Sequence, residues 1–234
     1  MATPTHPERE PVPFHKKETQ VSLNQRAYDE IRRRILSGEL GADSPLSEHQ
    51  LAMELELSRT PVREAIKRLE HERLVLSIPN RGTFVAELSA RDISEIYHVR
   101  EQLESFAARI CAERLPDEGI LKIETEIILS NKLASEGRHL EIVESDVRLH
   151  KHIIFSTQNS RLIDVLATLD DQMHRVRALF PQSSQWLEAT LVEHASIAAA
   201  IKAHDGAGAE NAMRTHLRSS REHAIRQSYP IDFL

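Results

Sequence analysis

The chain has little cysteine and no long apolar segment. Cys111 is the single cysteine among 234 residues, which excludes an internal disulfide and any zinc finger built on paired cysteines. Nowhere do about 18 apolar residues follow one another, so no transmembrane helix is predicted. We therefore expect a soluble cytoplasmic protein that does not bind a membrane.

An excess of positive charge is also absent. The formal net charge is −6, residues 1–88 are nearly neutral, and most of the negative charge lies in residues 89–234. DNA-binding domains usually carry a basic face, because phosphate contacts supply much of their affinity. If this chain binds DNA, the local clusters of basic residues at 26–34 and 59–68 must provide the attraction to the phosphates.

Composition divides the chain into three parts. Residues 1–20 contain four prolines and alternating charges without an apolar stretch, which is typical of a flexible arm and not of a signal peptide. The remaining length suits two domains. We predict a mixed α/β winged helix-turn-helix domain at residues 21–88 and an all-helical bundle of six to seven helices at residues 89–234.

The first part of the predicted headpiece is helical. Tyr28, Ile31 and Ile35 recur on one face of a helix over residues 23–36, which Gly38 ends. A second helix is predicted to begin at Ser47, with Gln50 completing a capping box. The arginines at the end of the first helix are expected to contact DNA phosphates: Arg33 and Arg34, beside Arg32.

A third helix and a hairpin complete the headpiece. Val62, Ile66 and Leu69 form an inward stripe behind Ser58 or Thr60 as the N-cap, so the basic side chains of this helix point outward. Residues 74–78 and 83–85 are short β-prone runs around a turn in which Gly82 can take a positive φ. This order of elements predicts a winged helix that binds DNA.

These residues resemble the GntR family of transcriptional regulators. The resemblance rests on residues 28–38, 46–51, 58–70 and 80–85, and it implies that the third helix enters the major groove while the wing reaches the minor groove. One position departs from the pattern, because His49 stands where some members have arginine. The resemblance implies DNA contacts by Arg59, Thr60, Arg63, Arg81 and Gly82.

The second domain is predicted to be entirely helical. Pro116, Gly137, Asn159, Pro181 and Gly206 separate its periodic segments. The predicted helices cover residues 90–114, 117–135, 139–158, 160–180, 184–204 and 207–227.

Polar residues interrupt three apolar stripes of this domain. Asp146 and His150 share one helical face with Ile142 and Ile153, because positions three and four apart are neighbours on a helix. His194 and His216 lie on similar stripes of two later helices. Carboxylate and imidazole suit a divalent transition metal such as Zn²⁺, Ni²⁺ or Mn²⁺. Alternatively, the histidines are hydrogen-bonded core residues without a metal.

Residues 96–224 resemble the FCD ligand-binding domain of FadR-like GntR regulators. Members often hold a metal through an Asp-x-x-x-His motif and two later histidines, positions that Asp146, His150, His194 and His216 occupy here. The resemblance also implies effector contacts by Arg100 and Asn159. Arg100 has a structural alternative, which is a salt bridge to Glu104 or to an aspartate of the bundle.

The sequence therefore predicts a homodimeric transcriptional regulator, with repression as the expected sign. Its predicted partners are a near-palindromic double-stranded operator and a small carboxylate effector at the metal, and residues 87–90 are expected to couple the two domains. Two alternatives stay open: a helical metal-dependent hydrolase with a DNA-targeting headpiece, and a metal-free dimerisation scaffold.

Overall fold

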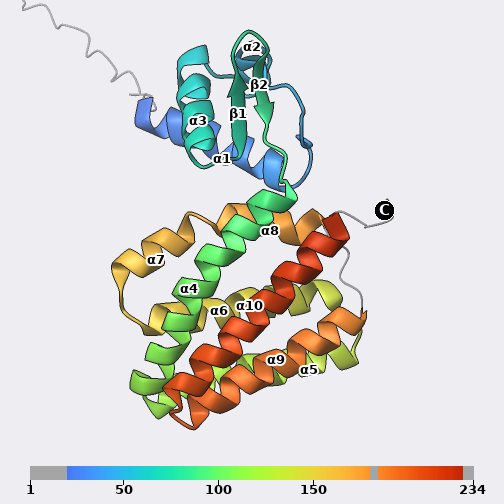
Figure 1. Cartoon of the computed structure of the whole chain (residues 1–234). Helices are drawn as coiled ribbons and strands as arrows, with labels where there is room; N and C mark the ends of the chain where they lie inside the picture. The colour runs from blue at the N-terminus through green and yellow to red at the C-terminus, as the bar shows by residue number, and fades with distance from the viewer. Residues whose placement is uncertain (1–19, 180–183, 229–234) are drawn as a thin grey trace, which may run out of the picture.

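The computed structural model describes residues 20–179 and 184–228. Within these ranges, a small headpiece stands on one end of a larger helical bundle (Figure 1). The headpiece elements are α1 (Gln20–Leu36), α2 (Glu48–Glu54), α3 (Arg59–His71), β1 (Val75–Ile78) and β2 (Gly82–Val85). The mainly helical fold class with an N-terminal winged helix, predicted from the sequence, is confirmed.

The headpiece has its own hydrophobic core. Ile31 of α1, Leu69 of α3 and Leu74 before β1 are fully buried, and the core residues run from Ala27 to Val85. The two strands pair antiparallel, with Val75 opposite Val85. This separate core lets the headpiece act as an independent folding unit.

The capping box predicted at α2 is only half formed. The Ser47 side chain accepts from the Gln50 amide at 3.3 Å, as expected. The Gln50 side chain donates instead to Glu54, one turn further along the helix, at 2.9 Å. A partner four residues away competed successfully for that side-chain amide.

Seven helices make up the described bundle. They are α4 (Ala90–Arg114), α5 (Asp117–Ser135), α6 (His139–Ser156), α7 (Ser160–Ala167), α8 (Asp170–Leu179), α9 (Ser184–Lys202) and α10 (Gly206–Ser228). The single helix predicted at residues 160–180 is wrong, because the chain breaks after Ala167 and restarts at Asp170. Neither proline nor glycine marks this break, whereas Asp170 and Asp171 favour a new helix N-terminus.

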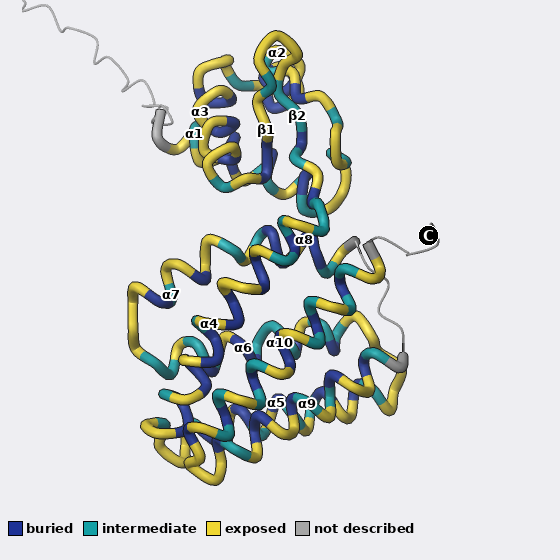
Figure 2. Tube along the Cα trace, in the orientation of Figure 1, coloured by how far each residue is buried: buried dark blue, intermediate teal, exposed yellow. Residues whose placement is uncertain are grey.

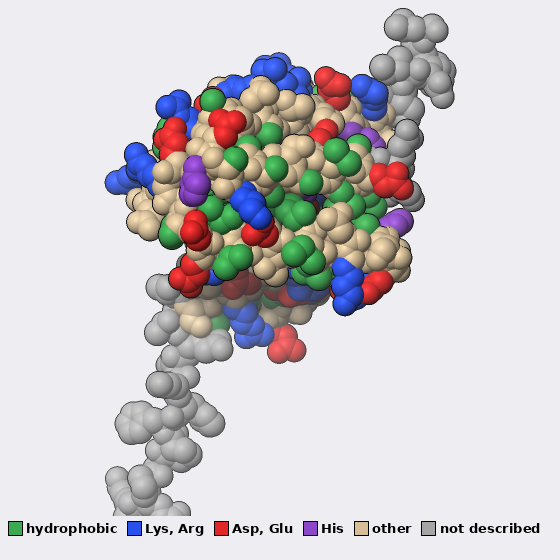
Figure 3. Space-filling model, turned by 90° about the horizontal axis from the view of Figure 1, so that it is seen from below, with side chains coloured by type: hydrophobic (Ala, Val, Ile, Leu, Met, Phe, Trp, Pro, Cys, Tyr) green, Lys and Arg blue, Asp and Glu red, His purple; other side chains and the backbone are tan. Residues whose placement is uncertain are grey.

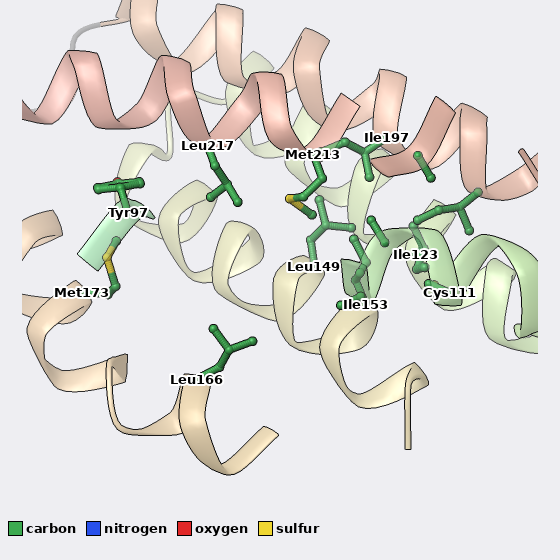
Figure 4. Close-up of a cluster of buried hydrophobic side chains, with 14 of the residues drawn as sticks. Tyr97, Cys111, Ile123, Leu149, Ile153, Leu166, Met173, Ile197, Met213 and Leu217 are labelled. Atoms are coloured by element: carbon green, nitrogen blue, oxygen red, sulfur yellow. The ribbon is translucent and has the colours of Figure 1, made fainter. Parts of the chain in front are cut away.

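The bundle core lies between α4, α6, α9 and α10. Side chains such as Leu149, Ile153, Ile197 and Leu217 are almost completely buried there (Figure 4). Buried segments face the interior on every long helix, and the exposed ones face outward (Figure 2). No helix in the described ranges is long and apolar enough to cross a membrane.

Helix α8 lies directly beneath the headpiece (Figure 1). Its Asp171 forms a bidentate ion pair with Arg32 of α1. Gln172 donates to the Glu72 carbonyl at 3.2 Å, and Arg175 donates to the Ala86 carbonyl. Three polar contacts therefore tie one bundle helix to three parts of the headpiece.

Candidate functional site

Helix α3 presents a polar outer face. Ser58 is its N-cap residue, and the stripe of Val62, Ile66 and Leu69 is buried as predicted. Arg59, Thr60 and Arg63 belong to the exposed side of the helix. These side chains can therefore reach a DNA groove without disturbing the core.

The wing tip is exposed as well. Gly82 has a φ of 108°, which a side chain rarely tolerates, and Asn80 also takes a positive φ of 62°. Arg81 lies beside this turn, with its guanidinium 5.8 Å from the Phe84 ring centroid. The turn thus leaves the Arg81 cation exposed at the wing tip.

Several arginines expected to contact DNA form ion pairs in the free protein. Arg63 contacts Glu48 at 3.0 Å, and Arg33 contacts Glu30 at 2.8 Å. Both arginines are more than half exposed, so these pairs are weak and phosphate can replace the carboxylate. Arg34 is different, because its side chain is only 16% exposed and bonds to both Glu30 and Glu54.

Four predicted metal ligands converge inside the bundle. Asp146 and His150 come from α6, His194 from α9 and His216 from α10, and one ligand atom from each lies within 4.8 Å of all the others. The Nε2 atom of His216 is 3.2 Å from that of His150 and 3.3 Å from that of His194. Asp146 Oδ1 is 3.3 Å from His194 Nε2. The inward-facing polar residues of three helices therefore form one cluster.

Two glutamates orient the histidine rings. Glu104 of α4 lies 2.5 Å from His150 Nδ1, and Glu193 of α9 lies 2.9 Å from His216 Nδ1. Each carboxylate accepts a hydrogen bond when Nδ1 carries the proton. In that tautomer Nε2 is unprotonated, and its lone pair points toward the other residues of the cluster. This is the arrangement that metal-binding histidines use.

The cluster has an unusual electrostatic environment. Burial lowers the pKa of His216 to about 4, so its ring is neutral near neutral pH. Burial alone would raise the pKa of Asp146, but the hydrogen bond to His194 and the nearby positive charges hold it well below its usual range. His216 and Asp146 are therefore in the protonation states in which imidazole and carboxylate bind a metal.

The predicted effector residues have different surroundings. Arg100 is buried and bonds to Glu104 at 2.5 Å, so its structural alternative is realised. Asn159 is the N-cap of α7, where its side chain accepts from the Leu162 amide at 3.2 Å, and it does not line the cavities beside the cluster. Arg177 of α8, which the sequence did not predict as an effector residue, contacts Asp146 at 3.4 Å.

A small cavity of about 40 Å³ adjoins the cluster. Asp146, His150 and His216 form one wall, and Arg177 and Thr190 lie on the others. Trp186 also borders it and stacks on His223 with ring centroids 4.9 Å apart, consistent with a packing role. The cavity places an arginine and a hydroxyl beside the four ligand atoms.

Sequence comparisons identify both domains. The FCD domain model matches residues 95–219, which is more than half of the chain, and the model of bacterial regulatory proteins of the gntR family matches residues 23–85. The chain belongs to the GntR family, with an FCD domain. It is therefore a DNA-binding transcriptional regulator and not an enzyme, which removes the hydrolase alternative.

Characterised relatives align over most of their length. The repressor RspR of Escherichia coli K12 is 27% identical over 215 residues, covering 90% of this chain and 93% of the relative. The gluconate operon repressor of Bacillus licheniformis is 29% identical over 193 residues, covering 80% and 79%. A GntR regulator from Rhodococcus sp. RHA1 shares the fold, with a TM-score of 0.70, 22% identity, and coverage of 89% of this chain and 99% of that chain.

Proposed function

We propose that this GntR regulator is a homodimeric repressor whose operator affinity depends on a small carboxylate bound at a divalent transition metal. The observation that carries the proposal is the convergence of three imidazole Nε2 atoms and one carboxylate oxygen in a buried site. Zn²⁺, Ni²⁺ and Mn²⁺ all accept such ligands. Asp146, His150, His194 and His216 would hold the ion.

The histidine geometry fits a cation. With Nδ1 of His150 and His216 donating to glutamates, both Nε2 lone pairs face each other at 3.2 Å. Two lone pairs at this distance repel unless a ring proton or a metal ion lies between them. Metal–nitrogen bonds of about 2.0 to 2.1 Å place neighbouring ligand nitrogens roughly 2.9 to 3.4 Å apart, which matches the observed separations.

A carboxylate effector fits the remaining surroundings. Four protein ligands leave positions open on an ion that accepts five or six, and a bound metal would act there as a Lewis acid toward carboxylate oxygen. Arg100 and Arg177 both line the cavity. Arg177 is the more available cation, because its contact with Asp146 is 3.4 Å long, whereas Glu104 holds Arg100 at 2.5 Å. An effector carboxylate would compete with Asp146 for the Arg177 guanidinium.

The names of the relatives support both repression as the regulatory effect and a small carboxylate as the effector class. RspR and the gluconate operon protein are named as repressors, and gluconate is itself a small carboxylate.

Gluconate should bind the Ni²⁺-loaded protein in a calorimetric titration, and EDTA or Arg177→Met should weaken binding at least tenfold. Equal binding to apo and metal-loaded protein would contradict a carboxylate site at the metal.

Helix α8 provides a route from this site to the headpiece. One side of the helix contributes Arg177 to the cavity, and another side holds Arg32 and the Glu72 carbonyl through Asp171 and Gln172. Because the same short helix joins both, a movement of Arg177 is transmitted to the headpiece contacts. This route acts beside the joint at residues 87–90.

Asp171→Asn should uncouple the two domains. Loss of the ion pair with Arg32 should accelerate amide hydrogen exchange in α1 by roughly fivefold, because a partly exposed pair contributes about 1 kcal/mol. Metal affinity should not change, since Asp171 lies outside the cluster. Asp170→Asn is the matched control, because Asp170 faces Lys151 at 3.3 Å and not the headpiece. Unchanged exchange in Asp171→Asn would exclude α8 as the route.

A homodimer is the assembly we propose on the operator. One headpiece exposes few base-reading side chains, so two copies on related half-sites are needed for useful affinity. The bundle offers exposed apolar side chains for association, including Phe106, Ile128 and Val192. Figure 3 shows hydrophobic side chains gathered across its lower face.

Sedimentation velocity of the purified protein should give a molar mass twice that of one chain. A monomer bound to the full operator would contradict this assembly.

A further inference from the structure

A second cleft lies between the headpiece and the bundle, outside the metal cluster. It has a volume of about 540 Å³, within the range of sites for small ligands. Its apolar lining comes from α1, the turn after it, the joint and α8: Ile35, Leu36, Leu40, Val85, Leu88 and Ala178. Domain interfaces are frequent places for ligand sites.

Among the described residues that line this cleft, Arg175 is the one basic side chain, and no ion pair joins it to a carboxylate. Arg175 of α8 is only 7% exposed, and its Nη2 donates to the Ala86 carbonyl. Within the described part of the chain, its Nη1 is buried without any hydrogen-bond partner. Burial lowers the pKa of the Arg175 guanidinium, and Asp92 offsets this only in part.

Comparison with Arg100 shows what is missing at Arg175. Arg100 is as deeply buried, at 6% exposed, but Glu104 bonds to it at 2.5 Å. A buried cation without a direct ion pair is destabilising, because the distant charge of Asp92 replaces only part of its lost hydration. Glu87 also lines the cleft, but it is exposed and no ion pair joins it to Arg175 in the described ranges.

We infer that this interdomain cleft is a second ligand site, which binds a monocarboxylate with an apolar body. The apolar walls suit an aliphatic or aromatic body, and the unpaired guanidinium suits one carboxylate. The negative charge of Glu87 disfavours a dianion. Nη1 is covered in this state, so Arg175 must turn toward the cleft when the carboxylate enters. The inference does not depend on the metal proposal.

Octanoate is a suitable probe for calorimetry with the full chain. Its dissociation constant should be on the order of 0.1 to 1 mM, and octanamide, which lacks the charge, should bind at least tenfold more weakly. Arg175→Met should cause a similar loss. This variant should melt close to the wild type, because the loss of the hydrogen bond to the Ala86 carbonyl is offset by removal of a buried charge that has no ion pair.

Two further variants keep the test independent of how Arg175→Met folds. Ala178→Phe should fill the cleft and also weaken octanoate binding at least tenfold. His174→Phe is its control, since His174 is exposed on the same helix and does not line the cleft. His194→Ala should bind octanoate normally, which separates this site from the metal cluster.

The inference is overturned by any of three results. Octanoate could fail to bind at about 10 mM, well above the expected dissociation constant. Octanoate could bind Arg175→Met as tightly as it binds the wild type. If Arg175→Met does not fold, equally tight binding to Ala178→Phe would have the same meaning. Finally, loss of binding in His194→Ala with normal binding in Ala178→Phe would place octanoate in the bundle instead.

Discussion

His194→Ala should purify without stoichiometric metal and melt roughly 5 to 15 °C below the wild type. One ion links α6, α9 and α10, so its binding free energy contributes to the folding of the bundle. A metal present at 100 to 1,000 times its dissociation constant stabilises by about 3 to 4 kcal/mol. In a protein of this size, each kcal/mol corresponds to about 2 to 4 °C in melting temperature.

The matched control for this variant is His174→Ala. His174 is exposed on α8 and follows Asp170 at the same four-residue spacing that Asp146 and His150 share, but it lies outside the cluster. It should keep both metal and melting temperature. EDTA should lower the wild-type melting temperature and leave His194→Ala unchanged. A wild-type melting temperature indifferent to EDTA and to added Ni²⁺ would support a metal-free scaffold.

Arg59→Ala and Arg63→Ala should each weaken operator binding by about 1 to 3 kcal/mol, or roughly tenfold to a hundredfold. Both side chains are exposed on α3, outside the buried stripe of Val62, Ile66 and Leu69. Because they make no core contact, the melting temperature should hardly change. Fluorescence anisotropy with a duplex selected by the wild-type protein measures the affinity.

Arg226→Ala is the control for nonspecific loss of positive charge. Arg226 is exposed near the end of α10 in the bundle, and its ion pair is with Glu222 on the same helix. Its operator affinity should stay within twofold of the wild type, because a distant exposed charge is screened. If either α3 variant bound the operator as tightly as this control, that arginine would not contact DNA.

Helical periodicity indicated that each of the four cluster residues faces the bundle interior, and the family resemblance grouped them as metal ligands. Asp146 and His150 lie one turn apart on α6, and the stripes of α9 and α10 turned His194 and His216 toward the same interior. Periodicity describes a face of one helix, and it does not say which residues of a neighbouring helix come close. That four such residues meet is a property of the tertiary packing.

The residues around the cluster could not be predicted in this way. Glu193 directly precedes His194 on α9, and its side chain reaches His216 on the adjacent α10. Glu104 was considered only as a partner of Arg100, whereas it bonds to both Arg100 and His150. Both contacts join different helices, so helix spacing within one segment carries no signal for them.

The role of α8 was missed because its start was missed. The sequence predicted one helix over residues 160–180, with Asp170 and Asp171 in its middle, because neither proline nor glycine interrupts that segment before Asp170. Once the chain breaks after Ala167, α8 can turn beneath the headpiece, and Asp171 reaches Arg32. The apolar stripe alone does not distinguish one long helix from two short ones.

Elemental analysis of protein purified without chelators tests the central claim most directly. Inductively coupled plasma mass spectrometry should find about one transition metal ion per chain in the wild type, because the cluster offers one set of four ligands. The same measurement on His194→Ala should find almost none. A wild-type protein without transition metal, which also takes up none when Zn²⁺, Ni²⁺ or Mn²⁺ is added, would contradict the metal-dependent effector site.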